Sequence, residues 1–261
     1  MSIYTGTWNK REQRRMRLIV CEIMYREACA AVAQSANLID ITFMPKGLHD
    51  IGEEKMRSRL QEEINKTDPE KYEAILLGYG LCNNGVRGLT CPVKTVIFRA
   101  HDCIAILIGS RKRYKEYFDK NPGTFFKSPG WIERDSGLGV EGGVMQSLGL
   151  DLTYEEFVDK YGEENAEYII EILGDWTTKY KKLAYINTGM GDVEMFREAA
   201  KNDAANHNWE YLEIDGTSSP SPLQRLVDGN WNEDFLIAPA NSKITASNDE
   251  EILGFEQVSG D

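Results

Sequence analysis

The sequence lacks any apolar run close to the roughly 20 residues that a membrane-spanning helix requires. Of its 261 residues, 41% are hydrophobic, and we therefore expect a soluble globular protein with one large core or two modest ones. The opening stretch MSIYTGTWNKREQRR is basic but has no apolar core, so we expect no signal peptide and a cytoplasmic location.

Positive charge is also scarce, because 30 lysines and arginines stand against 42 aspartates and glutamates, for a formal net charge of −12. This charge opposes binding to phosphate backbones, and no basic stripe with interleaved aromatic residues overrides it. We expect neither a nucleic acid nor a membrane as a partner.

Cysteine and histidine are few, with five and three residues respectively. An odd number of cysteines at irregular spacing does not suit a disulfide framework in a protein without a secretory signal. The cysteines are therefore expected to be free thiols or metal ligands.

Short β-prone apolar runs alternate with helical stretches in the first half of the chain. The expected strands are Met16–Ile23, Ile39–Pro45, Tyr72–Gly80 and Lys94–Ala100. Nearly unbroken apolar strands separated by helices are typical of a parallel sheet covered on both faces. We expect an α/β protein with a parallel-sheet, Rossmann-like core at residues 16–120.

Residues 121–149 are rich in glycine and aromatic residues without periodicity, and we interpret them as a lid loop or a packing strap. Residues 150–261 are expected to form a helical connection and a second, smaller α/β half. Its expected elements are a capped helix from Thr153, helix Glu163–Tyr180, strand Lys182–Gly189, helix Asp192–Asn206, strand Trp209–Gly216, helix Pro222–Asp228 and strand Asp234–Ala240.

Cysteines and histidines follow the ends of the four expected strands. In chain order they are Cys21 near the end of the first strand, His49 after the second, Cys82 after the third, and His101 with Cys103 after the fourth. Ligands of open parallel sheets bind at the carboxyl ends of the strands, so we expect these residues to share one site. The alternative is that the cysteines pack as small hydrophobic residues, a role that we assign to Cys29, and we assign no function to His207.

Thiolate sulfur and imidazole nitrogen together suit zinc, copper(I) or an iron–sulfur centre. We predict that His101, Cys103 and Cys82 bind the metal, with Cys21 or His49 as a fourth or exchanging ligand. The His-x-Cys spacing resembles the zinc motif of corrinoid:thiol methyltransferases, in which the third cysteine instead follows the pair. An open position on zinc would bind a substrate thiol and leave it as a thiolate nucleophile.

Other roles for this region stay open. The stretch GYGLCNNG could form a backbone nest for an anion, completed by Arg87, Arg99 or Arg111, although it matches neither a P-loop nor a dinucleotide-binding fingerprint. Asp102 either orients a histidine or caps the following helix, and we favour the cap. The predicted substrate- or cofactor-binding residues are Tyr79, Arg99, Asp102, Phe125, Phe126 and Trp131. The last three are expected to close the site against water.

At LGYGLCNNG, RAHDCIAILIGSRKRY and PGTFFKSPGWIE the chain resembles the family known as domain of unknown function 1638, over roughly residues 17–185. That family occurs mainly in methanogenic archaea and anaerobic bacteria, and its genes are often associated with corrinoid-dependent methyltransferase systems. The resemblance implies an anaerobic setting and one-carbon chemistry, and it supplies no residue roles.

Three classes of function follow. The first hypothesis is a metal-dependent, thiol-activating methyltransferase of anaerobic, corrinoid-linked one-carbon metabolism, with zinc as the expected cofactor. The second is a non-catalytic protein that binds or carries a metal, an iron–sulfur cluster or a corrinoid. The third is a structural or regulatory protein with buried cysteines. The expected partners are a small-molecule thiol or a corrinoid protein.

Overall fold

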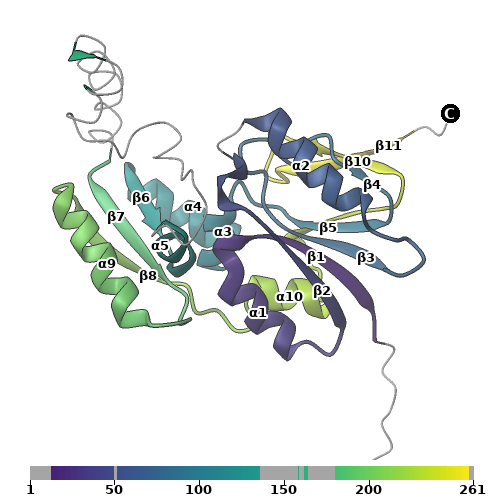
Figure 1. Ribbon diagram of the computed structural model, residues 1–261, viewed down its shortest axis with the longest axis horizontal. Coiled ribbons are helices and arrows are strands. Elements are labelled where there is room, and N and C mark those ends of the chain that lie inside the picture. Colours follow the sequence, from purple (N-terminus) through teal and green to yellow (C-terminus); the bar gives the residue numbers. More distant parts are fainter. Residues whose placement is uncertain (1–12, 50–51, 136–157, 159–161, 164–179, 259–261) are drawn as a thin grey trace, which may run out of the picture.

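A computed structural model describes residues 13–49, 52–135, 158, 162–163 and 180–258. The described chain forms two lobes side by side, each built on its own sheet (Figure 1). None of the helices in these ranges combines the length and the hydropathy that a membrane span requires.

The first lobe contains a five-stranded sheet in the order β2-β1-β3-β5-β9. Its strands are β1 (Arg15–Cys21), β2 (Leu38–Met44), β3 (Ala74–Gly78), β5 (Lys94–Phe98) and β9 (Phe235–Ala238). The first four pair in parallel, and β9 joins the edge of β5 antiparallel. The structure thus confirms the α/β class and the four parallel neighbours expected from the sequence.

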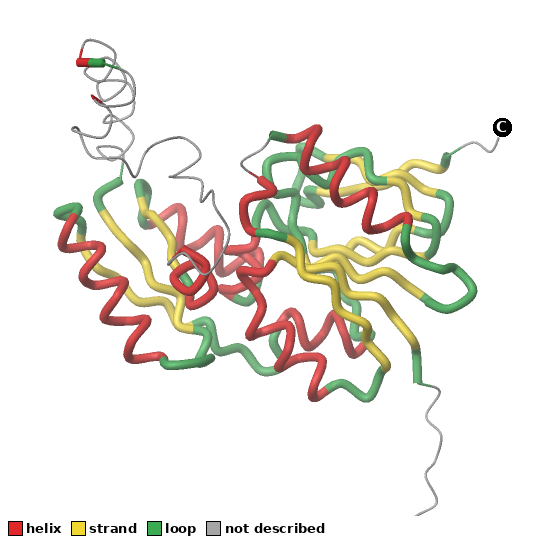
Figure 2. The backbone as a smooth tube through the Cα atoms, viewed as in Figure 1, coloured by secondary structure: helices red, strands yellow, loops and turns green. Residues whose placement is uncertain are grey.

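Helices cover both faces of this sheet (Figure 2). The helical elements of the first lobe are η1 (Glu22–Met24), α1 (Tyr25–Gln34), η2 (Lys46–His49), α2 (Glu53–Asn65) and α10 (Pro222–Asp228). In Figure 1, α2 lies on one face and α1 with α10 on the other. The helix α2 buries Met56, Leu60 and Ile64, which lie four residues apart and therefore form one apolar stripe toward the sheet.

A small antiparallel sheet, β11-β10-β4, completes the first lobe. Its strands are β4 (Thr90–Cys91), β10 (Ser242–Ala246) and β11 (Leu253–Gln257). Residues 222–257 therefore return to the first lobe, whereas the sequence-based division placed all of residues 150–261 in the second half. A short strand such as β9 carries no signal that tells which sheet it joins.

The second lobe is a parallel sheet in the order β6-β7-β8. Its elements, with the helices beside it, are α4 (Arg111–Lys120), β6 (Thr124–Lys127), α5 (Pro129–Asp135), β7 (Lys182–Asn187), α9 (Val193–Asn206) and β8 (Glu210–Asp215). The helix α3 (Cys103–Ile108), which precedes them, packs into the core of the first lobe. Part of the expected loop at residues 121–149 is thus regular structure, and residues 136–149 lie outside the described ranges. The expected helices from Thr153 and at Glu163–Tyr180 fall almost entirely outside them too.

The helical stretch after the fourth expected strand is divided into α3 and α4. Gly109 adopts a φ of 109°, which ends α3, and the Ser110 side chain accepts a hydrogen bond from Arg113 N to begin α4. Positive φ is accessible to glycine without a steric penalty, so this residue permits the break.

Candidate functional site

A cavity of about 270 Å³ lies at the carboxyl ends of β1, β3 and β5. In the sheet, β2 lies on one side of β1 and β3 lies on its other side. The strand order therefore reverses between β1 and β3. Such a reversal leaves a crevice in which α/β proteins bind ligands. The cavity is lined by Cys21, Ile23, Pro45, Lys46, Leu48, Met56, Tyr79, Cys82, Asn83, Asp102, Cys103, Ile104 and Trp131.

Three cysteines reach this cavity from three strand ends. Cys21 is the last residue of β1, Cys82 follows β3, and Cys103 begins the helix after β5. The backbone joins the last two segments directly, because Cys82 N donates to the His101 carbonyl at 2.8 Å. All three are free thiols, and Cys21 is buried whereas the other two are partly buried.

The glycines of LGYGLCNNG allow this close approach. A Cβ on Gly80 would lie 2.6 Å from the Ala100 carbonyl oxygen, and one on Gly85 would lie 2.1 Å from Met56 Sδ. Between them Cys82, Asn83 and Asn84 all have positive φ, from 44° to 63°, a conformation that non-glycine residues seldom adopt. Several residues held in such sparsely populated regions often mark a functional site.

Three amides of the same stretch are already used within the protein, which leaves them unavailable to an anion. The Leu81 and Cys82 amides donate to the carbonyls of Ala100 and His101, and the Gly85 amide donates to the Cys82 carbonyl. The guanidinium of Arg99 binds the carboxylate of Glu251 at 2.8 Å and backbone carbonyls near it, away from this turn. Glycine serves here for close packing of backbone segments.

Burial is the main influence on the ionisation of the cysteines. It raises the pKa of Cys21 to about 12, with the nearby Lys46 charge acting weakly in the opposite direction. Burial also raises the pKa of Cys82 to about 12 and that of Cys103 well above its usual value, and charge on the other thiols adds to both shifts. Without a cation among them, these thiols stay protonated at neutral pH.

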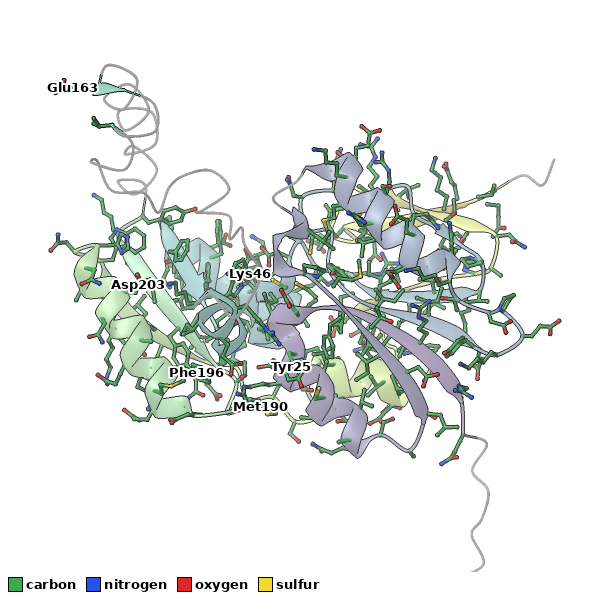
Figure 3. All side chains as sticks on the ribbon, in the orientation of Figure 1. Tyr25, Lys46, Glu163, Met190, Phe196 and Asp203 are labelled. Atoms are coloured by element: carbon green, nitrogen blue, oxygen red, sulfur yellow. The ribbon has the colours of Figure 1, made fainter. Side chains whose placement is uncertain are left out.

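Polar side chains complete the cavity wall. Asp102 caps α3, since its Oδ1 accepts from Ala105 N at 3.1 Å and its Oδ2 accepts from the Tyr114 hydroxyl at 3.2 Å. This geometry agrees with the favoured helix-cap interpretation. The Tyr79 hydroxyl is buried beside the Cys21 thiol, and its interaction with that thiol lowers the Cys21 pKa, against the larger effect of burial. Lys46, labelled in Figure 3 at the junction of the lobes, is buried with its ammonium 5.3 Å from the centre of the Trp131 ring.

The structure brings some of the predicted site residues together and not others. Six line the cavity: Cys21, Tyr79, Cys82, Asp102, Cys103 and Trp131. The side chain of His49, the last residue of η2, is outside the described part of the structure.

The structure places the remaining predicted residues elsewhere. His101 is exposed and lines a different hollow together with Tyr114 and Phe118, because its carbonyl faces Cys82 while its side chain turns outward. Phe125 packs against Tyr180 and Trp209. Phe126 packs against Tyr114 and Tyr117, and Arg99 binds the C-terminal segment.

One further cavity residue, Lys46, carries a signal in the sequence, whereas others carry none. Lys46 follows β2, so the strand-end rule that selected the cysteines also applies to it. Met56 and Leu48 come from α2 and η2, whose contribution depends on how helices pack over the sheet. No sequence pattern specifies that packing.

No three His, Cys, Asp or Glu side chains within the described ranges are placed to hold a metal ion as they stand. The three cavity cysteines therefore converge on one space without forming a ready-made coordination shell. Metal binding by them requires their side chains to rotate toward a common point.

The comparisons identify a family. The model of the family described as "Protein of unknown function (DUF1638)" matches residues 43–221, which is more than half of the chain. No curated protein and no solved structure gives a match. The chain belongs to the DUF1638 family, in agreement with the resemblance of its sequence blocks.

Proposed function

We propose that this member of the DUF1638 family binds a soft metal through Cys21, Cys82 and Cys103 and uses it to activate a small thiol for methyl transfer. The observation that carries the proposal is the convergence of three cysteines, from the ends of three neighbouring parallel strands, on one cavity. In this proposal Cys21 takes the ligand role that the sequence suggested for His101.

The donor set suits zinc or the iron of an iron–sulfur cluster, since thiolates prefer soft and borderline metals. Burial opposes ionisation of the three thiols, charge on neighbouring cysteines adds to it at Cys82 and Cys103, and a metal cation would offset both effects. Three protein ligands would leave a fourth position open, as catalytic zinc sites do. When bound, the metal would hold a substrate sulfur as a thiolate at neutral pH.

The chain's own residues shape the space around that position. Ile23, Leu48, Met56 and Trp131 give the cavity largely apolar walls, which exclude water from a thiolate and accommodate a methyl group. Asp102 holds the first turn of α3 and with it the backbone of Cys103. The Tyr79 hydroxyl is available to donate a hydrogen bond to sulfur.

Methyl transfer to the thiol sulfur needs no oxidant or reductant. The substrate thiol loses its proton to solvent, and a sulfur lone pair forms the bond to the methyl carbon. The bond between that carbon and its carrier breaks, and the carrier keeps the electron pair. A corrinoid carrier must be presented by a separate protein, because a cavity of about 270 Å³ is below the roughly 300–1,000 Å³ of sites for drug-sized ligands, and a corrinoid is larger still.

Metal content tests the site. After anaerobic purification and reconstitution with zinc, we expect about one zinc per chain in the unaltered protein and a marked loss in Cys103→Ser, because a serine hydroxyl is a poor ligand for a soft metal. Cys91→Ser is the matched control, since Cys91 is also a free cysteine but is buried in β4, outside the cavity. Equal zinc in all three proteins would refute the proposal.

Turnover distinguishes the enzyme from the carrier. Zinc-loaded protein is supplied with a methylated corrinoid and candidate thiols, and formation of thioether is followed. Metal binding without turnover would favour the carrier function that the sequence left as its second hypothesis.

A further inference from the structure

A second cavity, of about 280 Å³, lies between the two lobes. Its walls come from α1 and α3 on one side and from the turns after β7 and β8 on the other, with α10 closing it. Met190, which lines it, lies in Figure 3 where the second lobe meets α1. Because β6, β7 and β8 are parallel, this cavity is at the carboxyl ends of the second sheet, the usual ligand-binding edge.

Glu27 is the central polar group of this cavity. Its Oε1 accepts a hydrogen bond from the Thr188 hydroxyl at 2.5 Å, which ties α1 to the turn after β7. Its Oε2 is buried and has no hydrogen-bond partner among the described residues. Removal from water raises the pKa of this carboxyl, with the charge of Glu133 adding to the shift and that of Arg26 opposing it.

The rest of the wall supplies hydroxyls and no cation. The hydroxyl of Ser218 is also buried without a partner among the described residues, and Thr217, Ser219 and Ser221 line the same turn. No lysine, arginine or histidine is among the described residues that line the cavity. The nearby Arg26 is already bound to Glu133, with its Nε donating to Oε2 at 2.9 Å.

This chemistry selects one class of ligand. An anion would meet Glu27 with no positive charge on the wall to compensate, which a buried site does not tolerate. A cation would pair with the open carboxylate oxygen, and its remaining N–H groups would find acceptors in the Ser218 and Thr188 hydroxyls. An apolar tail would lie against Ala30, Ile106 and Leu107.

We propose that this interlobe cavity binds a small organic ammonium, held by Glu27 and Ser218. The site is separate from the thiol cavity: the two share no lining residue, and it does not depend on the proposed metal. Since its walls come from both lobes, the ligand would also tie the lobes together.

The test uses three four-carbon probes of matched size on the metal-free full chain: butylammonium, 1-butanol and butyrate. Binding is measured at neutral pH by titration with NMR detection of the Thr188 and Ser218 amides. We expect butylammonium to bind at least about tenfold more tightly than 1-butanol, and butyrate not to bind. Glu27→Gln keeps the shape of the side chain, removes its charge, and should abolish the advantage of the ammonium.

Glu194→Gln is the control, because Glu194 is an exposed carboxylate outside the cavity and its loss should leave butylammonium binding unchanged. Ser218→Ala, a smaller change, should weaken butylammonium several-fold and guards against a folding defect in Glu27→Gln. Butyrate or butanol binding as tightly as butylammonium would overturn the proposal. So would an absence of ammonium binding, or ammonium binding that survives Glu27→Gln.

Discussion

Burial keeps the thiols of Cys21 and Cys82 protonated at neutral pH in the metal-free protein, since it raises the pKa of each to about 12. A metal that binds thiolates must therefore displace protons from the cavity. Because the metal competes with protons, its apparent affinity rises with pH throughout the range below these pKa values.

The proton count gives the first prediction. Zinc binding should release about three protons, one from each cavity cysteine, and the apparent affinity should therefore increase by about a thousandfold per pH unit between about pH 6.5 and about pH 8. Calorimetry in buffers of different ionisation enthalpy measures the protons released. Affinity that does not change with pH would mean that zinc binds without deprotonating the thiols.

Single residues also mark where sequence reasoning reached its limit. The strand-end rule placed Cys21, Cys82 and Cys103 together, and the structure has them on one cavity. The rule gives the position of a residue on the backbone but not the direction of its side chain. His101 therefore shared the predicted edge, whereas its side chain is exposed on another surface.

At the scale of elements, the turn after β3 determines where Cys82 lies. Gly80 approaches the Ala100 carbonyl so closely that a Cβ would be 2.6 Å from its oxygen, a contact that backbone atoms cannot relieve by rotating. The turn after β3 and the turn after β5 are held together at this point by the amides of Leu81 and Cys82.

Gly80→Ala should therefore separate Cys82 from Cys103. We expect it to destabilise the protein by about 1–3 kcal/mol, as other overpacking substitutions do, and to lower zinc content as well. Gly254→Ala is the control, because the Cβ there would contact only the side-chain oxygen of Thr245, at 3.1 Å. Urea unfolding and metal analysis measure the two effects. Unchanged zinc content in Gly80→Ala would show that the turn does not position the ligands.

The elements themselves were largely predictable. Apolar runs and helical periodicity gave the four parallel strands and the helices α9 and α10 close to their observed bounds. The strand β6 was missed because four residues, TFFK, are too short to show a period. The return of β9 to the first sheet was also missed, since pairing between distant strands leaves no local signal.

At the scale of the whole molecule, the two lobes meet beside the thiol cavity. A Cβ on Gly130 would lie 1.7 Å from the Ile23 carbonyl oxygen, so α5 of the second lobe can approach η1 only through a glycine. The neighbouring Trp131 then covers the cavity, and Glu133 binds Arg26 across the junction. The second lobe thereby closes the thiol cavity. The three cysteines of that cavity all come from the first lobe, at or just after the ends of β1, β3 and β5.

The proposed function requires one metal to draw together three cysteines from separate segments of the chain. X-ray absorption at the zinc edge of the reconstituted protein tests it most directly. We predict three sulfur atoms at about 2.3 Å and one lighter ligand around zinc, and two sulfur atoms in Cys103→Ser for the zinc that remains. A shell of nitrogen and oxygen alone, or the same sulfur count in Cys103→Ser as in the unaltered protein, would contradict the proposal.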